Sequence, residues 1–355
     1  MQTFPPLGLT IPLIQAPMAG VSTPELAAAV SNAGALGSIA VGHIDPMRAR
    51  EQIRQTKSLT TRPFNVNLFC HAPAIRDTAK EAAWLQRLAP LFERYGAIPP
   101  TGLHEIYKSF NGDHEMLDVL QQEQPAVVSF HFGLPPASFI DALKKAGIVL
   151  LATATSLEEA RQMEVARIDG IVAQGIEAGG HRGIFDPDLV DDQLTTFALT
   201  RLLAREVGLP VIAAGGIMDG AGIAAALKLG AAGAQLGTAF IGCPESSASA
   251  TFRENLGSPA ARHTLMTRVV SGRPARSLPT KFTQFGKTIP PTEIPAYPIA
   301  YDAGKALAAA ANIQGDEGFG AQWAGQGAPL ARTMPAGKLV GVLSQEIEEA
   351  MASRE

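Results

Sequence analysis

Short apolar runs without polar alternation recur along the chain. Each is followed by a turn rich in Gly, Pro or Asn and then by a helical pattern, which is typical of parallel strands covered on both faces. Eight such runs predict strands at Leu13–Ala16, Leu36–Ala40, Phe64–Leu68, Ala126–Phe130, Val149–Ala152, Gly170–Ala173, Val211–Ala213 and Ala234–Leu236. Eight strands alternating with helices predict an α/β protein of the (β/α)8 TIM barrel type, which takes about 250 residues.

Helix start signals stand between these runs. Ser22 or Thr23 can cap a helix that carries Pro24 in its first turn. Ser156 begins a capping-box pattern, and Ala221–Leu229 is an alanine-rich helical stretch. These signals support the alternation of strand and helix.

About a hundred residues remain after the eighth predicted strand. Residues 244–334 contain many prolines and no further rhythm of strand and helix, so we expect an inserted, mostly helical cap over the barrel mouth. Gly337–Ser353 has the pattern of an amphipathic helix that returns to the barrel wall. The expected division is a barrel over 1–243, a cap or substrate domain over 244–334, and a C-terminal helix over 335–355.

Composition narrows the class of protein. The 355 residues are 46% hydrophobic and 17% charged, which excludes a disordered chain. With 29 Lys and Arg against 33 Asp and Glu, we expect no nucleic-acid partner. Cys70 and Cys243 stand far apart and outside any metal-binding pattern, so neither a disulfide framework nor a metal site is expected.

The location in the cell is expected to be cytoplasmic. Met1–Pro6 lacks the basic and apolar regions of a secretory signal. The most apolar stretch, 210–242, is interrupted by Asp219, Lys228, Gln235 and several glycines, so no membrane span is expected.

Glycine-rich loops follow the last two predicted strands. Phosphate groups are often held by these loops in a barrel of this type. Gly215 and Gly216 follow strand seven, and Gly237 and Thr238 follow strand eight, so backbone amides and a hydroxyl are available to a phosphate. The alternative is that the glycines serve only tight turns, which two such loops on consecutive strands disfavour.

Two histidines follow predicted strands. His181 lies in a loop with four glycines after strand six, which makes it the first candidate for acid–base catalysis. His131 follows strand four between two phenylalanines and is either a second site residue or a hydrogen-bonded wall histidine.

Smaller signals stand at other strand ends. Ala16 at the end of strand one, with Pro17 and Met18 after it, offers a soft surface for an aromatic heterocycle, and Asn67 can direct an amide inward from strand three. None of the eight strand ends carries a lysine nucleophile or a set of metal ligands. The barrel is therefore expected to use an organic phosphate cofactor.

These runs, above all Gln174–Gly183, resemble the nitronate monooxygenase family, formerly called 2-nitropropane dioxygenases. The resemblance covers essentially the whole chain and implies an FMN-containing TIM barrel with His181 as the active-site histidine. It also implies contacts to FMN from Ala16, Pro17, Met18, Asn67, Gln174, Gly179, Gly180, Gly215, Gly216, Gly237, Thr238 and Gln326.

The cap carries a narrower resemblance, to the bacterial and yeast class that acts on propionate 3-nitronate. Tyr107, Tyr297, Tyr301 and Lys305 match the tyrosines and the lysine around the substrate in that class. The spacing of Tyr297, Tyr301 and Lys305 places them on one face if the segment is helical, and the alternative is a solvated helix face.

The implied reaction is oxidation of an alkyl nitronate by FMN and O2 to a carbonyl compound and nitrite, by a monomer or homodimer. Two alternatives stay open. One is an NAD(P)H-dependent flavin reductase of the enoyl-acyl carrier protein or quinone reductase type, since those barrels are similar. The other is a non-catalytic binder of a flavin or a phosphorylated metabolite.

Overall fold

The computed structural model describes residues 9–352, so Met1–Pro6 and Ser353 lie outside the described part. The main sheet has eight parallel strands: β1 (Leu13–Gln15), β2 (Gly37–Ala40), β3 (Phe64–Phe69), β4 (Val127–His131), β5 (Val149–Ala154), β6 (Gly170–Gln174), β8 (Val211–Ala214) and β9 (Gly233–Leu236). All eight predicted strands are confirmed, with ends that differ by one or two residues.

The sheet closes into a barrel. Its strand order is β1-β9-β8-β6-β5-β4-β3-β2. The two ends meet through a parallel bridge between Ile14 and Leu36, where the Gln15 amide donates to the Leu36 carbonyl over 2.9 Å. Apolar residues from strands all round the sheet fill the interior, among them Ile14, Val127, Leu151, Val172 and Ile212. This packed interior leaves the C-terminal ends of the strands as the place for a site.

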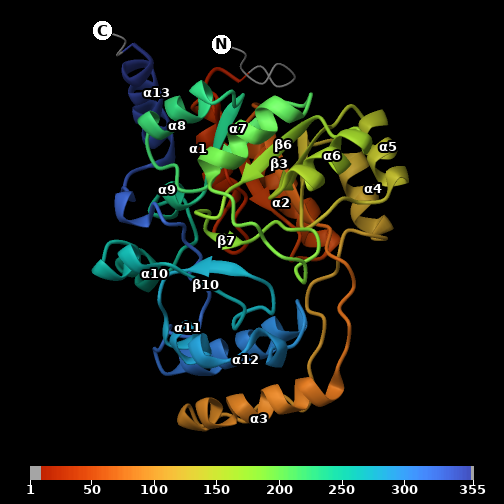
Figure 1. Cartoon of the computed structure of the whole chain (residues 1–355), viewed down its shortest axis with the longest axis vertical. Coiled ribbons are helices and arrows are strands. Elements are labelled where there is room, and N and C mark those ends of the chain that lie inside the picture. The colour runs from red at the N-terminus through yellow and green to blue at the C-terminus, as the bar shows by residue number, and fades with distance from the viewer. Residues whose placement is uncertain (1–8, 353–355) are drawn as a thin grey trace.

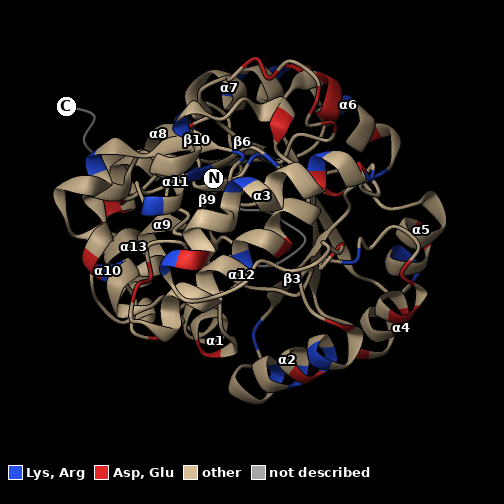
Figure 2. Ribbon diagram, turned by 90° about the horizontal axis from the view of Figure 1, so that it is seen from below, with Lys and Arg blue, Asp and Glu red and all other residues tan. Residues whose placement is uncertain are grey.

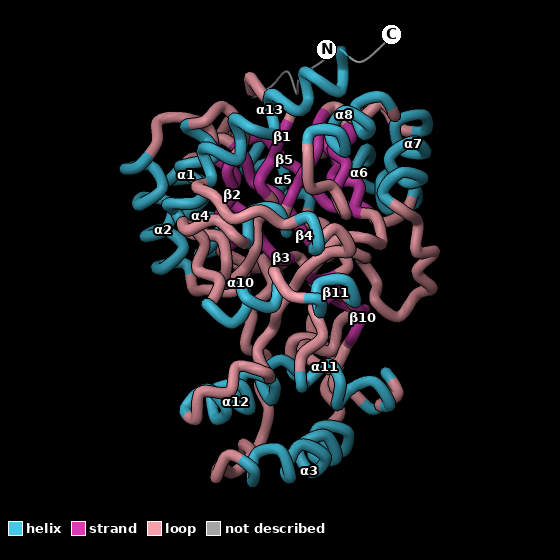
Figure 3. Tube along the Cα trace, turned by 90° about the vertical axis from the view of Figure 1, so that its left-hand side faces the viewer, coloured by secondary structure: helices cyan, strands magenta, loops and turns pink. Residues whose placement is uncertain are grey.

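Helices surround the barrel (Figures 1 and 3). They are α1 (Pro24–Asn32), α2 (Pro46–Leu59), α4 (His114–Glu123), α5 (Ala137–Lys145), α6 (Leu157–Val165), α7 (Thr196–Glu206), α8 (Gly220–Lys228), the short α9 (Thr238–Ile241) and α13 (Ala336–Ala352). The Thr23 hydroxyl caps α1 as expected. The capping box of α6 forms only in part, because the Glu159 carboxylate accepts from the Thr155 amide instead of the Ser156 amide.

The cap contains α10 (Ala250–Leu256), α11 (Lys281–Phe285) and α12 (Ile299–Ile313), with the 3-10 turns η2 (Pro259–His263), η3 (Gly286–Thr288), η4 (Pro291–Glu293) and η5 (Ala328–Leu330). It also contains two strands that the sequence did not indicate, β10 (Leu265–Thr267) and β11 (Ala275–Ser277). Together with β7 (Gly180–His181), from the loop after β6, they form an antiparallel sheet in the order β10-β11-β7. Cap and barrel are thus joined beside His181.

A second segment reaches the cap from within the barrel sequence. Helix α3 (Thr78–Arg94) lies far from the barrel, next to α11 and α12 (Figure 1). Its Trp84, Leu88 and Phe92 are buried in one cluster with Phe282 and Leu307 of the cap. The expected division at residue 243 did not place α3 with the cap. From the cap side, α3 and α12 lie across the barrel (Figure 2).

The last helix packs on the barrel wall. Leu339, Val340 and Leu343 of α13 are buried with Leu26 of α1 and Ile223 of α8. Within residues 9–352, no helix combines the length and the apolar character needed to cross a bilayer.

Candidate active site

A cavity of about 370 Å³ lies at the C-terminal ends of the barrel strands, beneath the cap. Its size and place are those of a cofactor or ligand site in this type of barrel. All but one of the predicted site residues line it: Ala16, Pro17, Met18, Asn67, Tyr107, His131, Gln174, Gly179, Gly180, His181, Gly215, Gly216, Gly237, Thr238, Tyr297, Tyr301 and Lys305.

The exception is Gln326. It lines a second pocket, on the other side of the Gly215–Gly216 turn, and its backbone amide donates to the Glu177 carbonyl over 2.9 Å. Gly325 and Gly327, its neighbours in the chain, do reach the main cavity.

One end of the cavity is rich in backbone donors. The amides of Gly215, Gly216 and Gly237 donate to no other described residue. Gly215 and Gly216 have φ of +125° and +69°, a region that favours glycine, so the turn can present its amides to the cavity. Thr238 follows, and its hydroxyl accepts from the Gly325 amide over 3.0 Å, which leaves its own proton to donate. This end suits a phosphate group.

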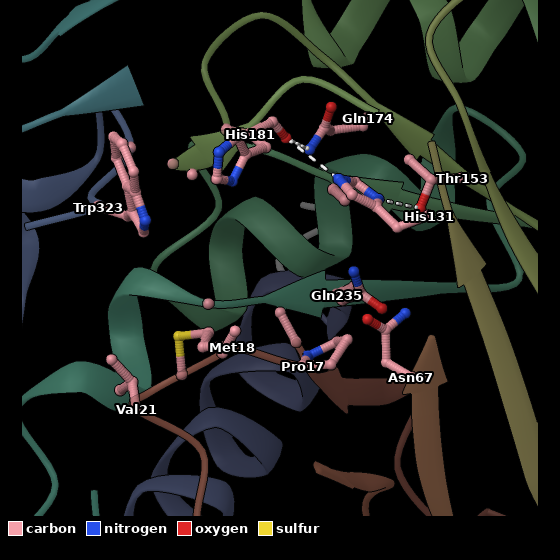
Figure 4. A pocket seen from close by; sticks show the side chains of 18 of the residues that line it. Pro17, Met18, Val21, Asn67, His131, Thr153, Gln174, His181, Gln235 and Trp323 are labelled. Atoms are coloured by element: carbon pink, nitrogen blue, oxygen red, sulfur yellow. Dashed lines mark hydrogen bonds between the residues drawn. The ribbon is translucent and has the colours of Figure 1, made fainter. Parts of the chain in front are cut away.

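Another part of the cavity lining combines the apolar side chains of Pro17 and Met18 with two polar side chains. Figure 4 shows Asn67 and Gln235 facing each other near Pro17 and Met18. The Asn67 amide nitrogen donates to the Ser129 hydroxyl over 2.9 Å, while its oxygen accepts from no described residue. The Gln235 side chain likewise has no described partner. Flat heterocycles with polar edges need such groups.

The loop after β6 is held by its own hydrogen bonds. The Gln174 side chain donates to the His181 carbonyl over 2.9 Å and accepts from the Gly183 amide over 2.7 Å. Arg182, which is 1% exposed, pairs with Asp191 over 2.8 Å. Gln174 thus fixes the loop and retains one amide hydrogen for the cavity, where its predicted contact to a cofactor stays a prediction.

His131 supports His181 from below, as the dashed lines in Figure 4 show. Its Nε2 donates to the His181 carbonyl over 3.2 Å, so its Nδ1 accepts from the Thr153 hydroxyl over 3.0 Å. Burial lowers the pKa of His131 to about 4, which keeps the ring neutral. Of the two interpretations left open by the sequence, the hydrogen-bonded wall histidine describes these contacts.

His181 presents its ring to the cavity from β7. Its Nε2 lies 2.8 Å from the Ser271 hydroxyl, and its ring centroid lies 5.0 Å from that of Trp323 and 5.6 Å from that of Tyr297. Burial, with smaller contributions from His131 and Arg273, lowers the pKa of His181 to about 3. A neutral imidazole at this position can accept a proton.

The cap side chains form the opposite wall. Tyr301 and Lys305 lie on α12, whereas Tyr297 precedes the helix and Pro298 caps it, so the predicted single helix face was wrong for Tyr297. The three still converge with Tyr107. The Lys305 ammonium lies 4.8 Å from the centroid of the Tyr107 ring and 5.6 Å from that of Tyr301, and it forms no ion pair with any described carboxylate.

Several lining residues were missed. His43, which follows β2, meets Tyr107 edge-on at 6.1 Å, and burial lowers its pKa to about 4. Its position at a strand end was the available signal. Gln235 lies near the end of β9, two residues before Gly237. Trp323 and Phe132 also line the cavity. Trp323 comes from an irregular cap segment that offers no sequence signal.

The described residues contain no cluster of three or more His, Cys, Asp or Glu that could hold a metal ion. Cys70 and Cys243 are free and buried.

Comparison with known proteins gives a consistent result. The family model described as nitronate monooxygenase matches residues 6–346. A nitronate monooxygenase of Paraburkholderia phytofirmans is 60% identical over 98% of this chain and 95% of its own, and one of Pseudomonas aeruginosa is 54% identical over 96% and 97%.

Solved structures agree. Nitroalkane oxidase from Streptomyces ansochromogenes superimposes with a TM-score of 0.90 at 40% identity, over 98% of this chain and 99% of its own. FabK from Thermotoga maritima has a TM-score of 0.75 at 30% identity, over 98% and 95%. With a TIM barrel, a cavity at its strand ends and full-length relatives at this identity, the chain is an enzyme that belongs to the nitronate monooxygenase family.

Proposed function

We propose that this enzyme uses FMN and O2 to oxidise alkyl nitronates, with propionate 3-nitronate as the favoured substrate. The products are the corresponding carbonyl compound and nitrite. The observation that carries the proposal is one cavity that holds unpartnered backbone donors, a neutral histidine and a lysine without a carboxylate partner.

The cavity fits the cofactor. Members of this family are flavin-dependent oxidoreductases. The three free amides at Gly215, Gly216 and Gly237 would hold the phosphate of FMN, while Asn67 and Gln235 would bind the polar edge of its ring. When bound, FMN supplies the redox chemistry that the side chains lack.

The cap side chains suit the distal end of the substrate. Propionate 3-nitronate carries a carboxylate besides its nitronate group, and such a group seeks a cation and hydroxyl donors. Lys305 is exposed at the cavity and forms no ion pair with a described carboxylate, with Asp302 attracting it only at longer range, and the rings of Tyr107 and Tyr301 lie against its ammonium. These three groups would bind the carboxylate and orient the chain toward His181.

His181 has a role that depends on the substrate. A nitronate is already deprotonated, so its oxidation needs no base. A neutral nitroalkane must first lose a proton, and the neutral His181 ring is the group placed to accept it. With His131 bonded to its carbonyl and Ser271 to its ring, His181 is fixed in orientation for that transfer.

The proposal is tested with the purified protein. We expect a flavin absorbance spectrum, release of FMN on denaturation, and O2 uptake with propionate 3-nitronate in the absence of nicotinamide. Rapid anaerobic bleaching by NADH or NADPH without nitronate-dependent O2 uptake would establish the flavin reductase alternative instead. A colourless protein that takes up no FMN would refute both.

A further inference from the structure

Arg273 is a buried cation directly behind the cavity wall. It belongs to the cap segment between Ser271 and β11 and is 3% exposed. Its guanidinium carbon lies 4.3 Å from the centroid of the Phe132 ring, and Phe132 lines the cavity. The centroid of the Phe132 ring lies 5.6 Å from that of the His181 ring. Phe132 thus separates Arg273 from the part of the cavity beside His181, which is where the proposed function places the reacting group of the substrate.

This cation has no close counter-charge. It donates to the carbonyls of Ile184 and Phe185, and its Nε has no partner. No carboxylate among residues 9–352 lies within ion-pair distance of it; Glu159 and Asp186 act on it only through longer-range attraction. Buried charges are ordinarily paired, because removing one from water is costly. A buried charge without a pair beside a ligand cavity therefore points to a role in the site.

The guanidinium is held in place relative to His181. The Ser271 hydroxyl bonds both the His181 ring, over 2.8 Å, and the Arg273 amide, over 3.3 Å. The residues that follow His181 and Arg273 are also bonded to each other, since the Arg182 amide donates to the Pro274 carbonyl over 2.8 Å. Phe132 has φ of +74°, a conformation that a bulky residue rarely adopts, so its ring is placed against the guanidinium at the cost of backbone strain.

We propose that Arg273 acts through Phe132 as a fixed positive charge that makes the cavity prefer an anionic nitronate to the neutral nitroalkane. Arg273 does not line the cavity, so it is a positioning residue rather than a catalytic one. Its charge acts at the reacting end, whereas Lys305 acts at the distal carboxylate. The inference rests on the proposed nitronate oxidation and names the residue that selects the charge state of the substrate.

The same charge affects the histidine. The charged and titratable groups that face His181 are His131 from β4, Arg273 from the cap segment, and the phenols of Tyr297 and Tyr301. After burial, His131 and Arg273 are the causes that lower the pKa of His181. Burial lowers the pKa of Arg273 itself only to about 10, so Arg273 remains a cation at neutral pH.

The test compares Arg273→Gln, Arg273→Lys and a matched control in the FMN-loaded enzyme. The control is Arg268→Gln, five positions earlier in the same segment, where the guanidinium pairs with Asp188 over 3.8 Å. Ethyl nitronate and nitroethane are the substrates, since neither carries a carboxylate for Lys305. For Arg273→Gln we expect KM to rise about tenfold for ethyl nitronate and less than twofold for nitroethane.

Arg273→Lys should keep the preference, and Arg268→Gln should leave both KM values unchanged. Equal KM increases for both substrates in Arg273→Gln, or the same loss in Arg273→Lys, would overturn the inference, since either result assigns a structural role.

Two measurements do not depend on turnover. Calorimetric titration with nitrite, as a small anion, should show binding about tenfold weaker in Arg273→Gln than in wild type. NMR titration of histidine-labelled wild-type enzyme should show His181 neutral down to pH 5. Because neither measurement needs turnover of a nitronate, both can test the role of Arg273 even if the proposed function fails. If Arg273→Gln does not fold, Arg273→Lys decides, and a tenfold rise of its KM for ethyl nitronate would overturn the inference.

Discussion

Gly179 is a position where a single methyl group should damage the site. A Cβ built on Gly179 would lie 2.5 Å from the amide nitrogen of Gly325 and 2.6 Å from the carbonyl carbon of Ala324. Ordinary contacts begin at 3.4 Å, so the backbone must separate by about 0.9 Å. The contact is reciprocal, because a Cβ on Gly325 would lie 2.9 Å from the Gly179 amide nitrogen.

The cost follows from what would have to move. Backbone atoms cannot rotate away as a side chain can, and overpacking of this kind costs about 3 kcal/mol. In a chain of this length that lowers Tm by about 5 °C. Gly179 lies two residues before His181, so the displaced loop also carries the histidine away from the substrate, and a shift near 1 Å costs about 100-fold in rate.

The assay is thermal unfolding of Gly179→Ala together with kcat for nitroethane. Gly341→Ala is the matched control, because Gly341 lies on the exposed face of α13 and a Cβ there meets nothing within 4 Å. Alanine in a helix should stabilise that variant by about 0.5–1 kcal/mol. A Gly179→Ala enzyme with the Tm and kcat of wild type would refute the packing argument.

Three further predictions concern charge and proton transfer. His181→Asn should lose far more activity with nitroethane than with ethyl nitronate, since only the first substrate needs a base; equal losses would assign another task to the histidine. Lys305→Met should raise KM for propionate 3-nitronate about three- to tenfold and leave that for ethyl nitronate unchanged; parallel changes in both KM values would contradict a carboxylate contact. His43, His131 and His181 have folded-state pKa values lowered to about 4, 4 and 3, below the ordinary 6.5. The unfolded chain therefore takes up more protons than the folded one as pH falls from about 7 to 4, and the free energy of unfolding should decrease over that range. Urea unfolding at pH 7 and pH 5 measures this, and greater stability at pH 5 would show that the histidines are not buried as described.

The barrel was predictable from the sequence because its strands are buried on both faces and appear as plain apolar runs, such as Val149–Ala154. The site was predictable where a residue lies at the C-terminal end of a strand, as His131 does, or directly after it, as Gly215 does. His43 also lies shortly after a strand, yet a histidine beside the single Gly42 gave a weaker signal than His181, whose loop holds four glycines.

The cap was less predictable, for physical reasons. Strands β10 and β11 have three residues each, too few to show a period of two, and they form by pairing with β7. The position of α3 is set by tertiary packing. An amphipathic helix has the same sequence pattern whether it packs on the barrel or on the cap, so the pattern alone does not distinguish the two. The spacing of Tyr297, Tyr301 and Lys305 would place all three on one helix face, but α12 begins only after Pro298, so Tyr297 lies outside the helix.

The position of α3 decides how this enzyme can be divided. Ending the chain at residue 243 would remove Phe282 and Leu307 and leave Trp84, Leu88 and Phe92 without the partners that bury them. Such a fragment would expose a continuous apolar helix face and invite aggregation. An isolated barrel would also need a short linker in place of the segment between β3 and α4, which contains α3. Grafting this cap onto another barrel therefore requires moving two insertions together, the α3 segment and the segment after β9.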